Sequence, residues 1–328
     1  MRAFRLPAIS LIMLLLAACA GEESIGSVPV ATADPEALRA ASVFLDTGKY
    51  DEAQVIVVRA AEVAPFDPDV VALQAELDLA RWKRDQTAGK AQAAIDGFLS
   101  AAKLSGDPAS QAAYQRNAAV VMSEEGQAEK AIATLRSARI AFPNDLQTLL
   151  FLAQVLSVSS EEDPQEVRSL YESVLSLDPD AYPAEVGLAM LDLEAGAYVG
   201  ARDRITALRV RRPNDRDLRL LHARIERRSG RPGVALNLLS VIPEGDRISG
   251  NMTFEYAASL IGAGRWLEAE LAFDLHAASR PKDVQLLNWA QALRGLSIGA
   301  AKRNPEAQAS ADRWQGRVDR QRGSSPSG

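Results

Sequence analysis

The chain has 328 residues, of which 47% are hydrophobic, 24% charged and 5% aromatic, with a formal net charge of −6. This composition is typical of a folded helical protein, and it excludes a chain that is disordered as a whole or a β-sandwich. The single cysteine excludes an internal disulfide, and the two distant histidines, His222 and His276, lack metal-ligand spacing. We therefore expect no cofactor and no metal.

The first eighteen residues have the pattern of a secretory signal peptide. Arg2 and Arg5 precede an almost wholly apolar stretch, which ends in Leu-Ala-Ala before Cys19. That stretch is shorter than the roughly 20 residues of a membrane-spanning helix. Leu-Ala-Ala-Cys resembles the bacterial lipobox, and this resemblance implies that Cys19 is acylated and becomes the N-terminus. The alternative is an ordinary signal peptide that ends near a cysteine.

An acylated Cys19 implies that the protein is held at a membrane, because several acyl chains anchor better than one. Residues 19–33 are small and polar, which indicates a flexible tether. Ala20 follows the cysteine, and similarity to enterobacterial sorting favours the periplasmic face of the outer membrane over the inner membrane. We therefore expect a lipid-anchored protein of the cell envelope.

A short unit recurs along the rest of the chain: glycine, one residue, an aromatic or small residue, two more residues, then alanine. The glycine suits a tight turn between two antiparallel helices, and the alanine allows those helices to approach closely. A proline twelve residues after the alanine ends the second helix. The units are 48–53, 126–131, 196–201, 230–235 and 264–269, and four of them have this proline: Pro65, Pro143, Pro213 and Pro281. Pro179 stands at the same distance after Val167, in a unit whose turn has no glycine.

This pattern resembles the tetratricopeptide repeat, a helix–turn–helix unit of about 34 residues. With the glycine as fifteenth residue, the small eighth position is Ala41, Ala119, Ala189, Ala223 and Ala257. The bulky twenty-fourth position is Val57, Leu135, Ile205, Leu239 and Phe273. Two irregular units occupy 68–108 and 146–179.

The resemblance covers residues 34–282 and implies an all-α fold, an α-solenoid of about seven helical hairpins around a concave groove. Residues 283–322 are predicted to form C-terminal capping helices, and residues 323–328 a disordered tail.

Charge divides the chain unevenly, which suggests oriented binding to charged partners. Residues 19–200 carry a net charge of −16 and residues 201–328 one of +8. The resemblance implies that positions 2, 5, 9 and 12 of each first helix line the groove. The candidate partner-binding residues are Leu220, Arg224, Arg227, Arg228, Val186, Met190, Leu193, Phe254 and Ile261.

Arginines beside an apolar floor would suit an extended peptide that carries an acidic residue. The alternative is a solvated arginine face paired with Asp203, Asp215, Asp217 and Glu226.

No motif for catalysis is present: the sequence lacks a nucleophile elbow, a phosphate-binding glycine loop and a zinc-protease helix. The arginine-rich stretch lacks interleaved aromatic residues, which argues against nucleic acid. We expect neither catalysis nor a small-molecule substrate.

The architecture, a lipid anchor followed by a repeat array, is similar to that of the Tad/Flp pilus assembly lipoproteins. This resemblance implies an adaptor that binds protein partners of the cell envelope to assemble a pilus or secretion apparatus. The alternative is a regulator or scaffold of peptidoglycan-modifying enzymes.

Overall fold

A computed structural model describes residues 33–324 except 88, 160–162, 244, 246–249 and 302–303. The predicted signal peptide, Cys19 and the tether up to residue 32 lie outside the described residues, as do residues 325–328. Two predicted boundaries are wrong. Ala33 is buried and its amide donates to the Asp67 carboxylate at 3.1 Å, so it is not flexible tether. Gly323 and Ser324 end the last helix, so the predicted disordered tail does not begin at 323.

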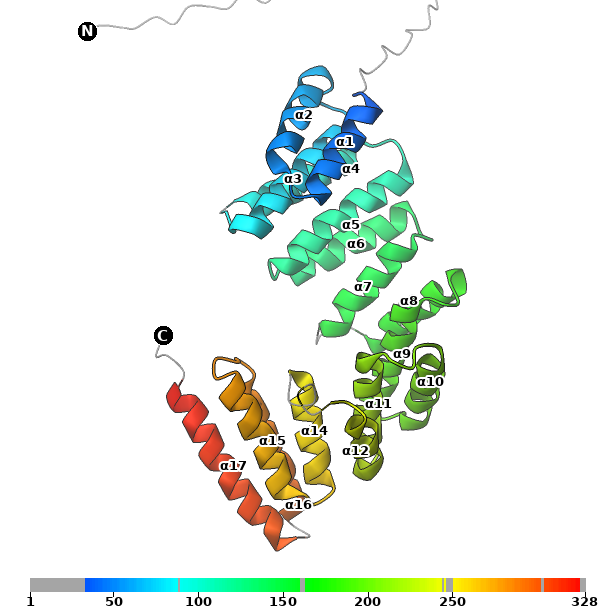
Figure 1. Ribbon diagram of the computed structural model, residues 1–328. Coiled ribbons are helices and arrows are strands. Elements are labelled where there is room, and N and C mark those ends of the chain that lie inside the picture. The colour runs from blue at the N-terminus through cyan, green and yellow to red at the C-terminus, as the bar shows by residue number, and fades with distance from the viewer. Residues whose placement is uncertain are drawn as a thin grey trace, which may run out of the picture.

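The described residues form consecutive antiparallel helical pairs (Figure 1). The first helices are α1 (Pro35–Asp46), α3 (Pro68–Asp85), α5 (Pro108–Glu124), α7 (Leu146–Val158), α9 (Tyr182–Glu194), α11 (Arg216–Arg228), α14 (Asn251–Gly262) and α16 (Leu286–Ala301). The second helices are α2 (Tyr50–Val63), α4 (Lys90–Leu104), α6 (Ala128–Ala141), α8 (Pro164–Leu177), α10 (Tyr198–Arg211), α12 (Pro232–Ser240), α15 (Trp266–Ser279) and α17 (Pro305–Ser324).

Local chemistry sets where these helices begin and end. Aspartates such as Asp34, Asp107 and Asp215 accept hydrogen bonds from amides of the first turn, which satisfies donors that have no partner within the helix. The predicted turn glycines have φ between +73° and +80°, a conformation that glycine adopts without penalty. Each predicted proline follows its helix end by two residues, as α2 and Pro65 show.

The predicted core positions are confirmed. The five alanines at the eighth position are fully buried, and the five bulky residues at the twenty-fourth position are at most 2% exposed. Helices approach so closely that a Cβ added at Gly97 would lie 2.8 Å from the Ala75 Cβ atom. Each hairpin therefore buries its apolar face against its neighbours, as in a repeat solenoid.

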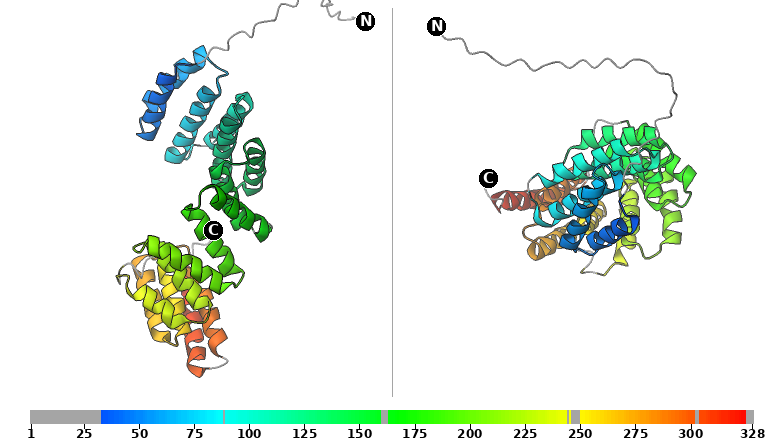
Figure 2. Two further views of the ribbon diagram at one scale, coloured as in Figure 1. Left: turned by 90° about the vertical axis from the view of Figure 1, so that its right-hand side faces the viewer. Right: turned by 90° about the horizontal axis from the view of Figure 1, so that it is seen from above.

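The pairs stack into a curved array whose two ends turn toward the same side (Figures 1 and 2). Most consecutive first helices pack on one another, as α1 does on α3, α11 on α14 and α14 on α16, whereas among the described second helices comparable packing occurs only between α15 and α17. In a curved array, neighbouring helices on the inner side lie closer together than those on the outer side. The first helices therefore line the concave side.

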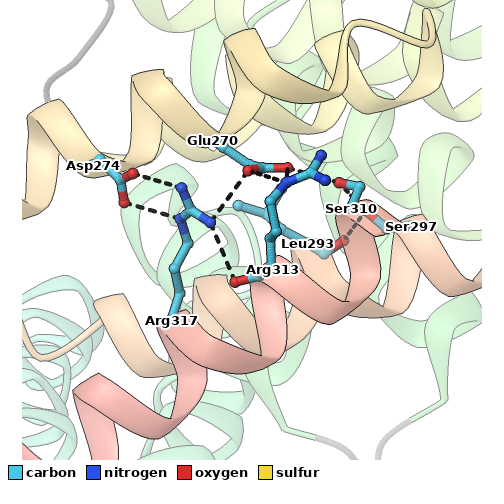
Figure 3. Close-up of polar contacts among 7 residues, drawn as sticks. All are labelled: Glu270, Asp274, Leu293, Ser297, Ser310, Arg313 and Arg317. Carbon is cyan, nitrogen blue, oxygen red and sulfur yellow. Dashed lines mark hydrogen bonds and ion pairs between the residues drawn. The ribbon is translucent and has the colours of Figure 1, made fainter. Parts of the chain in front are cut away.

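Helices α16 and α17 pack together as an eighth hairpin, and α17 closes the array with a largely polar outer face. A polar cluster holds α17 on α15 (Figure 3). Arg317 binds Asp274 and Glu270, while Arg313 Nε and the Ser310 hydroxyl donate to Glu270 at 2.8–3.0 Å. We call these five residues the α15–α17 latch.

Within the part of the chain that the structure describes, no helix is both long and apolar enough to cross a membrane.

Candidate protein-binding groove

The arginines predicted to line the groove form ion pairs with carboxylates of neighbouring first helices. Arg227 Nε and Nη2 donate to Glu255 of α14, at 2.5 and 3.2 Å, and Arg224 Nε lies 3.4 Å from the same carboxylate. Glu255 is fully buried, and the side chains of Arg224 and Arg227 are 33% and 15% exposed. The two arginines therefore fasten α11 to α14.

Arg228 points the other way and binds Glu194 of α9 at 2.6 Å. Hydrogen bonding to that carboxylate raises the pKa of the Arg228 guanidinium. Arg224, Arg227 and Arg228 therefore do not pair with Asp203, Asp215, Asp217 or Glu226, since their partners lie on adjacent first helices. Of these four carboxylates, Glu226 does pair within the arginine-rich stretch, with Arg202 at 2.7 Å and Arg231 at 2.5 Å. The role of Arg224, Arg227 and Arg228 in binding a partner stays a prediction, and their donors are largely engaged within the chain.

The predicted apolar floor is only partly accessible. Met190 is 48% exposed, and Val186, Leu220 and Phe254 are half-buried. Leu193 and Ile261 are 1% and 2% exposed and belong to core clusters, so their placement as groove-lining residues was wrong. Both occupy position 12 of their unit, where consecutive first helices come into contact.

An open cleft of about 350 Å³ lies between α1, α3 and α5, at the other end of the array. Its apolar lining is Pro35, Leu38, Ala72 and Leu73, and its polar lining is Arg39, Ser42, Asp69, Glu76 and Tyr114. All of these residues belong to first helices, so the cleft opens on the concave side.

Carboxylates dominate the electrostatics of this cleft. Burial, with the nearby negative charge of Asp46, raises the pKa of Glu76. The Tyr114 hydroxyl donates to Asp69, and burial together with this bond raises the pKa of the tyrosine. The acidic first half of the chain thus presents hydrogen-bond acceptors in the groove, whereas the groove arginines of the second half, Arg224, Arg227 and Arg228, are already paired.

Sequence reasoning missed this cleft, although the signal was available. Counting the same positions in the first unit gives Pro35, Leu38 and Ser42, which all line it. The second unit is irregular, and its count works only when Ala75, the buried alanine beside Gly97, is taken as the eighth residue. Asp69, Ala72 and Glu76 then occupy positions 2, 5 and 9.

His222 lies in a second buried polar cluster, behind the groove. Arg209 Nη1 lies 2.9 Å from His222 Nδ1, and since the guanidinium can only donate, that nitrogen is the acceptor. Nε2 then carries the proton and faces Glu226 at 3.3 Å. Burial and the positive charge of Arg209 lower the pKa of His222, so the ring is neutral.

The described residues hold no group of three or more His, Cys, Asp or Glu side chains that could bind a metal ion. The groove instead offers an acidic cleft at one end, an exposed methionine in the middle and paired arginines beyond it. Such a surface can hold an extended peptide through side-chain pockets and hydrogen bonds.

Known proteins of the same fold support this description. A tetratricopeptide-repeat family model matches residues 160–225. Among curated proteins, none matches the chain in sequence.

Solved structures are similar across most of the array. A tetratricopeptide repeat protein from Parabacteroides merdae is 17% identical with a TM-score of 0.59, over 79% of this chain and 97% of that one. Pseudomonas aeruginosa pilF is 17% identical with a TM-score of 0.54, over 67% of this chain and 93% of that one. A chain of the APC/C hetero-tetramer Cut9–Hcn1 is 12% identical with a TM-score of 0.57, over 79% of this chain and 49% of that one.

At these identities the likeness concerns the fold. The chain is an α-solenoid with the tetratricopeptide-repeat architecture, and residues 160–225 match the repeat family itself.

Proposed function

We propose that the protein is a scaffold, anchored in the bacterial envelope through an acylated Cys19, that binds protein partners in its groove. Its task is to assemble an envelope machine such as a pilus or secretion apparatus. The observation that carries the binding role is the concave side itself, a surface of first helices with an open cleft at its N-terminal end. The anchor rests on the Leu-Ala-Ala-Cys pattern at residues 16–19.

The comparisons support the scaffold role at the level of architecture. The same repeat arrangement occurs in a chain of the Cut9–Hcn1 assembly, which is a complex of proteins. Repeat solenoids present long surfaces relative to their mass, which suits them to hold an extended partner.

A crosslinked pull-down from intact cells tests the proposal. The tagged wild-type chain is compared with Cys19→Ser, which removes the acylated thiol and leaves the described residues unchanged. We expect the wild type to fractionate with membranes and to recover a pilus or secretion component, and Cys19→Ser to lose the membrane association.

Recovery of peptidoglycan hydrolases or synthases instead would favour the role of a cell-wall scaffold. Recovery of no envelope protein by the membrane-bound wild type would contradict both.

A further inference from the structure

A carboxylate without a partner lines the cleft between α1, α3 and α5. No hydrogen bond or ion pair to a described residue engages the side chain of Glu76. Burial and the negative charge of Asp46 raise the pKa of Glu76, so its charge destabilises the fold at neutral pH. A charge that costs stability and has no counterion within the chain points to a ligand that supplies one.

The other charged groups of the cleft leave this carboxylate uncompensated. Asp69, the second carboxylate of the lining, accepts a hydrogen bond from a neutral donor, the Tyr114 hydroxyl. Arg39 is the one cation among the described residues that line the cleft, and it is exposed. It does not offset the negative charge at Glu76, whose pKa is raised. The cleft therefore favours a positively charged occupant.

The rest of the lining suits the stem of a long basic side chain. Leu38 of α1 is half-buried, and Ala72 and Leu73 of α3 are buried. Lysine and arginine place their methylene stems along apolar surface of this kind and keep the charged end at a polar group. The volume of about 350 Å³ is at the small end of binding pockets, so the cleft has room for a few side chains and not for a folded domain.

A metal ion is a poorer match than a basic side chain. Calcium and magnesium ions need several oxygen ligands at one point, and the described residues hold no group of three or more His, Cys, Asp or Glu side chains that could bind a metal. Asp69 and Glu76 are seven residues apart on α3, which is two turns and about 10 Å along the helix axis. A lysine ammonium, in contrast, is a compact charge that one carboxylate can pair with.

We propose that this cleft binds a basic segment of the protein partner, with a lysine ammonium at Glu76 and the lysine stem against Leu38 and Leu73. The inference rests on the proposed scaffold function and names the chemistry of the partner that the groove takes.

Titration of the full chain, carrying Cys19→Ser to remove the acylated thiol, tests the site. Glutamate labelled with ¹³C at its side-chain carboxyl reports on each glutamate, and Glu76→Gln assigns the relevant signal. The probe is the acetylated and amidated tetrapeptide Ala-Lys-Leu-Ala, and its match carries norleucine, which has the same stem without the ammonium. We expect the lysine peptide to shift the Glu76 signal and the norleucine peptide to bind about tenfold more weakly.

Matched variants separate the site from the fold. Glu76→Gln should lose the preference for lysine in calorimetric titrations, although it should melt no lower than the wild type because it removes a destabilising charge. Glu62→Gln, on the exposed side of α2, should keep the preference. Arg39→Gln should strengthen binding of the lysine peptide, because it removes the competing cation.

Equal affinity of the wild type for the two peptides, or a lysine preference that persists in Glu76→Gln, would overturn the proposal. So would a shift of the Glu76 signal that calcium ions produce and the lysine peptide does not, since that would assign the cleft to a metal ion. Failure of the scaffold function would appear separately, as a pull-down without envelope proteins while the lysine peptide still shifts the Glu76 signal.

Discussion

The buried ion pair between α11 and α14 gives the sharpest prediction on stability. Arg227→Met keeps much of the aliphatic volume but removes both short contacts to Glu255, which is fully buried. The remaining charged contact is Arg224, whose Nε lies 3.4 Å away. Removing one partner of a buried pair costs about 3–5 kcal/mol, because the other charge stays desolvated.

Arg228→Met is the matched control, one residue along the same helix. Its partner Glu194 is 67% exposed, and solvent-exposed pairs contribute about 0–1 kcal/mol. Urea denaturation followed by circular dichroism should separate the two variants by at least about 2 kcal/mol. Hydrogen exchange should show the loss of protection in α11 and α14. Equal destabilisation by the two variants would refute the reasoning.

Three further predictions follow from single contacts. Gly187→Ala should lower the unfolding free energy by about 1–3 kcal/mol, because the added Cβ would overlap the Tyr171 ring; Gly233→Ala, with open space, is the control in thermal denaturation. His222 has a pKa below its unfolded value, so the unfolded chain binds more protons and stability falls as pH drops through 6.5. His222→Gln should flatten that dependence in urea titrations between pH 7.5 and 5, and an unchanged slope would contradict it. Glu76 has a raised pKa, so its charge destabilises the fold at neutral pH; Glu76→Gln should raise the melting temperature at pH 7, and the gain should vanish at pH 4.

The hairpins could be predicted because their signals are local. A turn glycine, a buried alanine and a terminating proline act within one unit, and they place most helices before any tertiary contact is known. The eighth hairpin lacks that signature. Its turn precedes Pro305, and the Asn304 side chain caps the Glu306 amide in place of a glycine turn, so the sequence predicted capping helices and not a full hairpin.

The groove could be predicted only in outline, since its surface depends on how consecutive units pack. Position 12 is buried at Leu193 and Ile261 because the concave side compresses the first helices. The partner of Arg227 is 28 residues away in the next unit, and no local pattern distinguishes Glu255 from nearer carboxylates. The sequence therefore predicted which types of residue lie on the first helices. Which of them form ion pairs depends on how the curvature brings consecutive units together.

Site-specific photocrosslinking in living cells tests the central claim, that the concave side is where a protein partner binds. A benzophenone amino acid at Met190, which is 48% exposed on α9, is compared with one at Val210, 78% exposed on α10. The account predicts that Met190 crosslinks a defined envelope protein and that Val210 does not. Crosslinking from Val210 alone, or the same products from both positions, would contradict it.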